Sequence, residues 1–169
     1  MLQCRCAWIL GTVLLAACHG DASNAPLAPA RPVVKKAAVL GPGPSAAELT
    51  AGMVEAVTVG KSTLPVDVKY ELARAPVIGQ AFDVTIALMP HIEADPAVLV
   101  VTGSDALLLS PGSGPVEIPT VEPAQVYRLT VTLTPAVDGV QLLALKVSLK
   151  HDDAVETREF SIPIIVGAQ

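Results

Sequence analysis

Strict alternation of apolar and polar residues runs through much of the chain from residue 65 onward. Residues 66–72 read Val-Asp-Val-Lys-Tyr-Glu-Leu, in which every second side chain is apolar. Successive side chains of a strand point to opposite faces of a sheet, so this pattern predicts a strand with one buried face. Related patterns and short apolar runs predict seven strands in all, at residues 66–72, 82–88, 97–101, 106–110, 127–133, 143–149 and 155–166.

Two features of the later strands carry further predictions. Residues 135–139, Pro-Ala-Val-Asp-Gly, form a turn in which Asp-Gly readily adopts positive φ, so we expect a β-hairpin between the strands on either side. In the last strand Phe160, Ile162 and Ile164 share one face. Pro163 has no N–H to donate, which predicts that this strand lies at a sheet edge or carries a bulge.

Seven short strands with regular turns and no helical pattern between them predict an all-β fold, an antiparallel β-sandwich over residues 64–167. The layout resembles immunoglobulin-like domains, although the disulfide and core tryptophan of antibody domains are absent. The alternative fold is a small β-barrel.

A different period precedes the strands. Ser45 and Glu48 have the spacing of a capping box, in which each side chain bonds to the backbone of the other residue. Leu49, Met53 and Val57 follow at helical spacing, and Gly60 is a plausible end. Residues 45–60 therefore predict a helix of about ten residues that packs on the domain or folds on a partner.

The first residues resemble the leader of a bacterial lipoprotein. Arg5 precedes an apolar run over residues 7–17, which fits a signal peptide and is too short to span a bilayer. The run ends in Leu15-Ala16-Ala17-Cys18, which resembles a lipobox. The resemblance implies removal of residues 1–17, lipidation of Cys18 and, because His19 follows it, sorting to the outer membrane. Cys18 would then be the single cysteine of the mature chain, with no disulfide possible within a monomer.

Residues 18–44 form the expected tether. They are rich in proline and alanine and hold few large apolar side chains, so they cannot bury enough surface to offset their ordering entropy. An extended Pro-rich segment rises about 3.1 Å per residue, which makes residues 18–44 a spacer of roughly 80 Å between a membrane and the domain.

Charge and composition exclude some functions. The net charge is −5 and no basic stripe occurs, so the electrostatic attraction that drives nucleic-acid binding is absent. The sequence contains no nucleophile elbow, phosphate-binding glycine loop or zinc-protease motif. We therefore expect a protein that is not an enzyme and needs no cofactor.

Two segments are candidate metal sites. Met89 and His91 pair a soft sulfur with an imidazole, as Cu(I) sites do, but such sites need about four soft ligands. The other candidates, Met53, His19 and His151, have no matching spacing. Residues 151–153, His-Asp-Asp, with Glu156 could offer oxygens to Ca²⁺, but Asp is also a common turn residue, so we interpret this segment as a turn.

These observations predict a binding or structural module of the cell envelope, anchored by lipid and docking on another envelope protein. The strand edge near Phe160, Ile162 and Ile164 is the expected docking site, because an unpaired edge accepts an added strand. The alternative functions are a periplasmic carrier of copper or of a small ligand and, third, a hydrolase.

Overall fold

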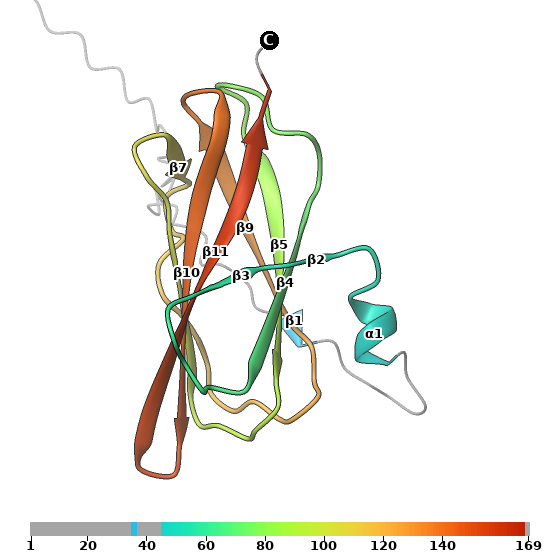
Figure 1. Cartoon of the computed structure of the whole chain (residues 1–169), viewed down its shortest axis with the longest axis vertical. Helices are drawn as coiled ribbons and strands as arrows, with labels where there is room; N and C mark the ends of the chain where they lie inside the picture. Colours follow the sequence, from blue (N-terminus) through green and yellow to red (C-terminus); the bar gives the residue numbers. More distant parts are fainter. Residues whose placement is uncertain (1–34, 37–44, 168–169) are drawn as a thin grey trace, which may run out of the picture.

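The computed structural model describes residues 35–36 and 45–167, which fold into eleven strands and one short helix (Figure 1). The elements are β1 (Lys35–Lys36), α1 (Ala46–Leu49), β2 (Val54–Glu55), β3 (Val57–Val59), β4 (Val66–Leu72), β5 (Phe82–Pro90), β6 (Ala97–Thr102), β7 (Leu107–Leu109), β8 (Val116–Ile118), β9 (Tyr127–Pro135), β10 (Gly139–His151) and β11 (Ala154–Val166).

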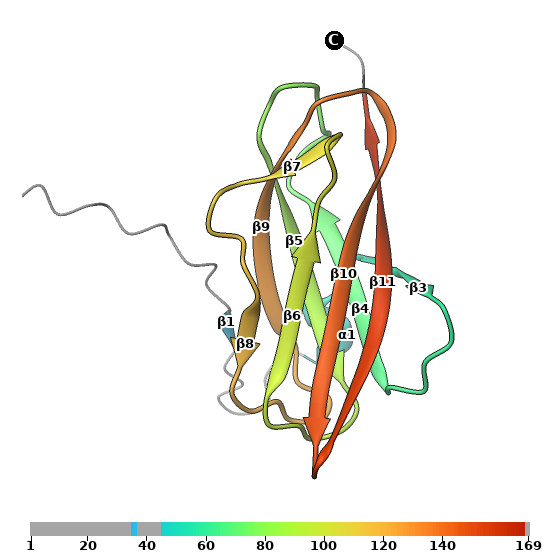
Figure 2. The same ribbon diagram turned by 90° about the vertical axis from the view of Figure 1, so that its left-hand side faces the viewer.

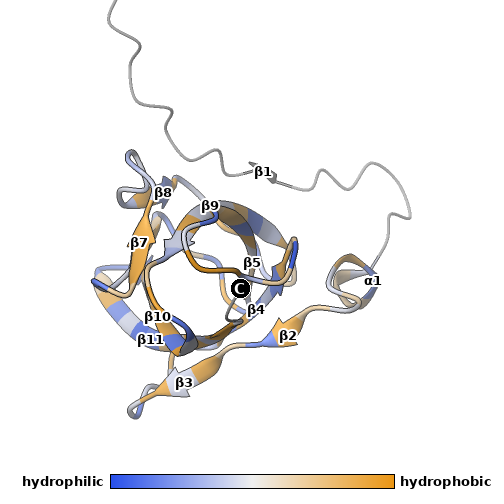
Figure 3. Cartoon of the chain, turned by 90° about the horizontal axis from the view of Figure 1, so that it is seen from above, coloured by the Kyte–Doolittle hydropathy of each residue, from blue (hydrophilic) through white to orange (hydrophobic). Residues whose placement is uncertain are grey.

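The strands form two antiparallel sheets. We call them sheet A, with the order β1-β9-β5-β4-β2 and β7 added on β9, and sheet B, with the order β3-β11-β10-β6-β8. Viewed from above, the two sheets lie on opposite sides of the core (Figure 3). The predicted antiparallel β-sandwich of the immunoglobulin-like class is thereby confirmed.

The alternating positions face the core as predicted. In β4 the apolar Val66, Val68 and Tyr70 are buried, whereas Asp67 between them is exposed. In β10 the buried side chains are Leu143, Leu145, Val147 and Leu149, and they pack with the inward residues of β11 and sheet A. Because the period is two, a shift of one residue would turn each strand's apolar set to the solvent.

All seven expected strands are present, but the count of seven was too low. Strand β4 matches its prediction at both ends, and the strand expected at residues 106–110 is shorter, at Leu107–Leu109. Four further strands, β1, β2, β3 and β8, have only two or three residues each. An alternating pattern cannot be recognised over so few positions.

The hairpin predicted at residues 135–139 was wrong in its pairing. The turn is present, and Gly139 has a φ of 88°. However, β9 before it belongs to sheet A, and β10 after it belongs to sheet B, so the turn joins the two sheets. The hairpin is instead formed by the next two strands, where β10 and β11 pair from Gly139↔Val166 to His151↔Ala154 and project beyond the rest of the sandwich (Figures 1 and 2).

The helix predicted over residues 45–60 ends at Leu49. The capping box is present: Ser45 Oγ accepts from the Glu48 N–H at 3.3 Å, and the Ser45 N–H donates to Glu48 Oε2 at 2.6 Å. After the helix, β2 pairs with β4 at the edge of sheet A, and β3 pairs with β11 at the edge of sheet B. The sandwich therefore begins upstream of residue 64, because residues 54–59 close one side of it (Figures 1 and 3).

The leader, Cys18 and most of the tether lie outside the described residues, so their predictions stay predictions. Within residues 35–36 and 45–167, no helix has the length and apolar character needed to cross a bilayer.

Candidate functional site

The edge of β11, the docking site expected from the sequence, is largely occupied. Phe160, Ile162 and Ile164 are buried in the core, with exposed fractions of at most 3%. Beside them, β3 covers β11 from Glu159 to Ser161. The next residue on that side, Pro163, has no N–H, and its carbonyl accepts the Tyr70 hydroxyl at 3.4 Å. The strand lies at an edge there, as Pro163 predicted, but few backbone groups are free to pair with a partner.

Arg158, which directly precedes the β3-paired residues of β11, closes the same side of the sandwich. Its Nη1 donates to the carbonyls of Leu64 and Val66 at 3.1 and 2.9 Å, and its Nη2 donates to Thr58 Oγ1 at 2.9 Å. The guanidinium also lies 5.1 Å from the centroid of the Phe160 ring, within cation–π range. These contacts link β11 to β3 and to the start of β4, so this edge is part of the fold.

The outer face of sheet B is the more accessible surface. Val140 and Ile165 are register partners on β10 and β11, and Leu142 and Pro163 form the next row. Val140, Leu142 and Ile165 are 65%, 59% and 72% exposed, and Pro163 is half-buried. In the following row, Ser161 lies between the exposed Val57 and Ala144. We call Val57, Val140, Leu142, Pro163 and Ile165 the apolar face.

A fourth row continues the outer face of sheet B. Val59 on β3 lies beside Glu159 on β11, which lies beside Lys146 on β10. Val59 is 48% exposed, and both charged residues are exposed. The face therefore changes from purely apolar at the Gly139 end of β10 to a row with one acid and one base.

The outer face of sheet A is built differently. Its exposed and half-buried positions on β5 and β9 include Thr85, Thr130, Thr132 and Asp83, and Thr132 donates to Asp83 at 2.6 Å. Its apolar corner consists of Ala87, Met89 and Val126, all buried. The side chains that pack on this corner are Ala46, Leu49 and Met53, from α1 and the residues after it.

The candidate copper ligands have separate roles in this arrangement. Met89 is 7% exposed and packs in the apolar corner under α1. His91 is exposed, and its Nε2 lies 2.8 Å from Asp67 Oδ2 as an ion pair or hydrogen bond. Among residues 35–36 and 45–167, no group of three or more His, Cys, Asp or Glu side chains is placed to hold a metal ion.

The candidate Ca²⁺-binding segment, residues 151–153, forms the tip of the β10–β11 hairpin. Asp152 has a φ of 52°, which Asp tolerates better than most residues, in agreement with its interpretation as a turn. His151 Nδ1 lies 2.8 Å from the Glu93 carbonyl, and because a carbonyl only accepts, this nitrogen carries the proton. His151 Nε2 lies 3.6 Å from Asp152 Oδ2.

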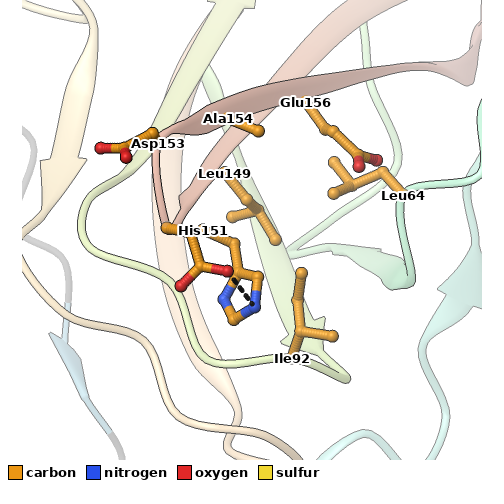
Figure 4. A pocket seen from close by; sticks show the side chains of 8 residues that line it. Leu64, Ile92, Leu149, His151, Asp153, Ala154 and Glu156 are labelled. Atoms are coloured by element: carbon orange, nitrogen blue, oxygen red, sulfur yellow. Dashed lines mark ion pairs between the residues drawn. The ribbon is translucent and has the colours of Figure 1, made fainter.

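A cavity of about 480 Å³ opens beside this tip (Figure 4). Leu64, Ile92 and Leu149 supply its apolar wall, from three separate segments of the chain. The hairpin tip adds His151 and three carboxylates, those of Asp152, Asp153 and Glu156. This cavity could hold a small molecule that combines an apolar part with a cationic group.

The apolar face was not predicted from the sequence, although the sequence holds a signal for it. Leu142-Leu143 and Ile164-Ile165 are consecutive apolar pairs within otherwise alternating strands. One member of each pair must point outward, because neighbouring side chains of a strand alternate in direction. The outward members are Leu142 and Ile165.

Comparisons with known proteins give similarities at the level of the fold. No protein-family profile matches the sequence, and no curated protein sequence matches it. The GAE domain of yeast GGA1 is 13% identical, with a TM-score of 0.43, over 63% of this chain and 96% of that domain. A PapD-like domain of human CEP192 is 12% identical, with a TM-score of 0.40, over 66% and 92% of the two chains. The C-terminal domain of wzt is 14% identical, with a TM-score of 0.41, over 70% and 80%.

Proposed function

We propose that this chain is a non-enzymatic lipoprotein of the bacterial cell envelope, whose sandwich binds a protein partner in the envelope through the apolar face. The observation that carries the docking surface is the exposure of Val140, Leu142 and Ile165 on adjacent strands. Contiguous exposed apolar surface of several hundred Å² marks interaction sites on soluble domains. The lipobox supports the membrane anchor, and residues 18–44 supply the spacer.

Docking on the outer face of sheet B takes the place of the strand addition at β11 that the sequence suggested. Strand addition needs free backbone groups, but β3 pairs with residues 159–161 of that edge, and the hydroxyls of Tyr70 and Ser62 donate to the carbonyls of Pro163 and Thr157. A sheet face instead offers side chains, and apolar side chains that are held on rigid strands bind with little loss of conformational entropy. The rigid pairing of β10 with β11 over thirteen residue pairs provides such a platform.

The docking surface is tested by photocrosslinking of the full chain in its native cells. A photoreactive amino acid replaces Leu142 on the apolar face in one variant and Thr130 on the outer face of sheet A in the other. We expect a protein adduct from position 142 and little from position 130, with the partner identified by mass spectrometry. Equal labelling from both positions, or none from 142, contradicts the proposed docking surface.

The membrane anchor is tested separately, by Cys18→Ala. Without the thiol that would receive the lipid, the protein should leave the membrane fraction and appear in the soluble fraction of the envelope. Cys6→Ala is the matched control, because Cys6 lies within the expected leader. Retention of the Cys18→Ala protein on the membrane contradicts lipidation.

The cavity beside the hairpin tip favours a second candidate function, a carrier of a small ligand. Its apolar wall and acidic rim suit an amphipathic cation. Alkylamines of increasing length are suitable probes, with shifts of the Ile92 and Leu149 methyl signals as the readout and Glu156→Gln as the variant that weakens binding. A copper titration of the same sample tests Met89 and His91. Absence of shifts at probe concentrations of about 1 mM removes this candidate.

A further inference from the structure

The two central strands of sheet B present rows that are complementary to one another. Val140 faces its register partner Ile165, Leu142 faces Pro163, and Lys146 faces Glu159. These three rows thus pair an apolar residue on β10 with an apolar residue on β11, or a base with an acid, and the row between them pairs the small residues Ala144 and Ser161. A surface that carries complementary halves side by side is complementary to a rotated copy of itself.

One particular rotation brings each strand of one copy over the complementary strand of the other copy. A two-fold axis parallel to the strands and midway between β10 and β11 places β10 of one copy over β11 of the other. Each residue then lies over its own register partner in the second copy, so that Lys146 lies over Glu159 of the second copy, and Val140 over Ile165 of the second copy. The strands of the two sheets remain nearly aligned, which is a preferred way for sheets to pack.

The size of the apolar surface suits such an interface. The exposed parts of Val57, Val59, Val140, Leu142 and Ile165 sum to on the order of 500 Å². A stable interface buries about 800 Å² on each partner. These five residues would supply roughly 60% of that area, with polar residues around them supplying the rest, and this is close to the apolar share of homodimer interfaces.

We infer that two copies of this chain pack face to face through sheet B, with β10 of each copy over β11 of the other. This inference rests on the proposed docking surface and names its occupant. A bilayer is a poorer occupant, because the row beside the apolar residues holds Glu159 as well as Lys146. An unrelated protein would have to reproduce a pattern of apolar, acidic and basic positions that a second copy already carries.

The proposed anchor would strengthen a weak dimer. Interfaces of this size range from micromolar upward in affinity, and we expect the low end because the face is flat and lacks aromatic residues. Copies tethered to one membrane are confined to a layer no deeper than the spacer, which raises their local concentration above that in free solution and favours the dimer.

Charge reversal tests the geometry. The full chain, solubilised in detergent, is examined by sedimentation equilibrium over a range of concentrations. Lys146→Glu places two acids against each other in both halves of the dimer, and Glu159→Lys places two bases there. Each single variant should raise the dissociation constant at least about tenfold. The double variant K146E/E159K restores opposite charges and should return the dissociation constant to near that of the original chain. Lys150→Glu is the matched control, because Lys150 pairs in register with Val155 and its reversal opposes no acid.

A second pair of variants tests the apolar rows. Leu142→Asp should raise the dissociation constant more than tenfold, because it buries a charge twice in one dimer. Leu108→Asp is its control, since Leu108 is 51% exposed but lies on β7, outside sheet B. Thermal unfolding of each variant verifies that the monomer is folded.

The possible outcomes separate the two proposals. A dimer that is weakened by each single reversal and restored by the double variant supports the inference. A chain that is monomeric up to about 1 mM overturns the inference. If the photoreactive group at position 142 then labels a different protein, the docking surface stands and only its occupant changes; if it labels lipid or nothing, the docking surface fails as well. A dimer insensitive to Leu142→Asp also overturns the inference.

Discussion

The two outer faces of the sandwich differ in whether other parts of the chain cover their apolar side chains. On sheet A, Ala87, Met89 and Val126 are buried because α1 and Met53 pack over them. On sheet B, Val140, Leu142 and Ile165 are more than half exposed. Both faces belong to sheets with the same alternating pattern and a shared core. The difference is therefore in what lies outside each sheet, and the chain provides a cover for only one of them within the described residues.

This difference distinguishes apolar residues that stabilise the fold from apolar residues that are free to bind a partner. A covered residue contributes to folding by leaving water when the chain folds. An exposed apolar residue contributes little to folding and gains its favourable transfer only when a partner covers it. Substitutions on the inner face, on the covered corner and on the apolar face should therefore have separable effects on stability and on association.

The largest effect is expected for the inner face of sheet B. Leu145→Ala removes a side chain that is 1% exposed and should lower the free energy of unfolding by about 2–5 kcal/mol. Leu142→Ala, three residues earlier and outward-facing, should change it by less than about 0.5 kcal/mol. Urea unfolding at a concentration where the chains are monomeric measures both. Equal destabilisation by the two variants would mean that Leu142 is packed in solution and does not belong to an exposed face.

The covered corner of sheet A should give an intermediate effect. Met89→Ala leaves a gap between sheet A and α1 and should cost about 2 kcal/mol of unfolding free energy. Amide exchange should quicken across α1 (Ala46–Leu49), because the helix is too short to persist without its packing. Exchange in β10 should stay unchanged, and quickening there as well would show that Met89 belongs to the main core.

The sequence predicted the parts of the fold that rest on local pattern. Val66 to Leu72 alternates without error, and β4 has those bounds. The capping box also depends only on neighbouring residues, Ser45 and Glu48. What it could not give was pairing between distant segments. The turn at Asp138-Gly139 reverses the chain whether β10 joins the sheet of β9 or the opposite sheet, and the structure has the opposite sheet.

Competition with distant partners also explains the shortened helix. Met53 and Val57 continue the spacing that begins at Leu49, but β-branched Val54, Val57 and Val59 favour extended backbone. The edges of β4 and β11 offer these residues hydrogen-bond partners, and Ala56 donates its N–H to Val68 at 2.9 Å. The apolar face is hard to predict for a related reason: Phe160, Ile162 and Ile164 form a pattern that indicates burial, and an exposed face appears only as exceptions to such a pattern.

A smaller effect is expected from making the apolar face more polar. L142T/I165T keeps the preference for strands but removes exposed apolar surface. The monomer should elute earlier from a hydrophobic interaction column, and its unfolding free energy should change little. Leu108→Thr, at an isolated exposed leucine, is the control and should shift elution less. Identical shifts would show that the apolar face does not act as one surface.

The smallest effect concerns the attachment of the cover on sheet A. Hydrogen bonds from the Ser45 N–H and the Ser45 hydroxyl hold the pKa of Glu48 below its ordinary value. A carboxylate with a lowered pKa stabilises the folded state at pH values above its unfolded pKa, and this contribution is lost as the pH falls through the folded pKa. Acidification should therefore loosen α1 while the two sheets persist. The Ser45 amide signal in NMR spectra should titrate below the ordinary pKa of glutamate and follow the signals of α1. Glu48→Gln keeps an acceptor for the Ser45 N–H but carries no charge, so it should abolish this titration. Persistence of the titration in that variant would assign it to another group and show that the attachment of α1 does not depend on the charge of Glu48.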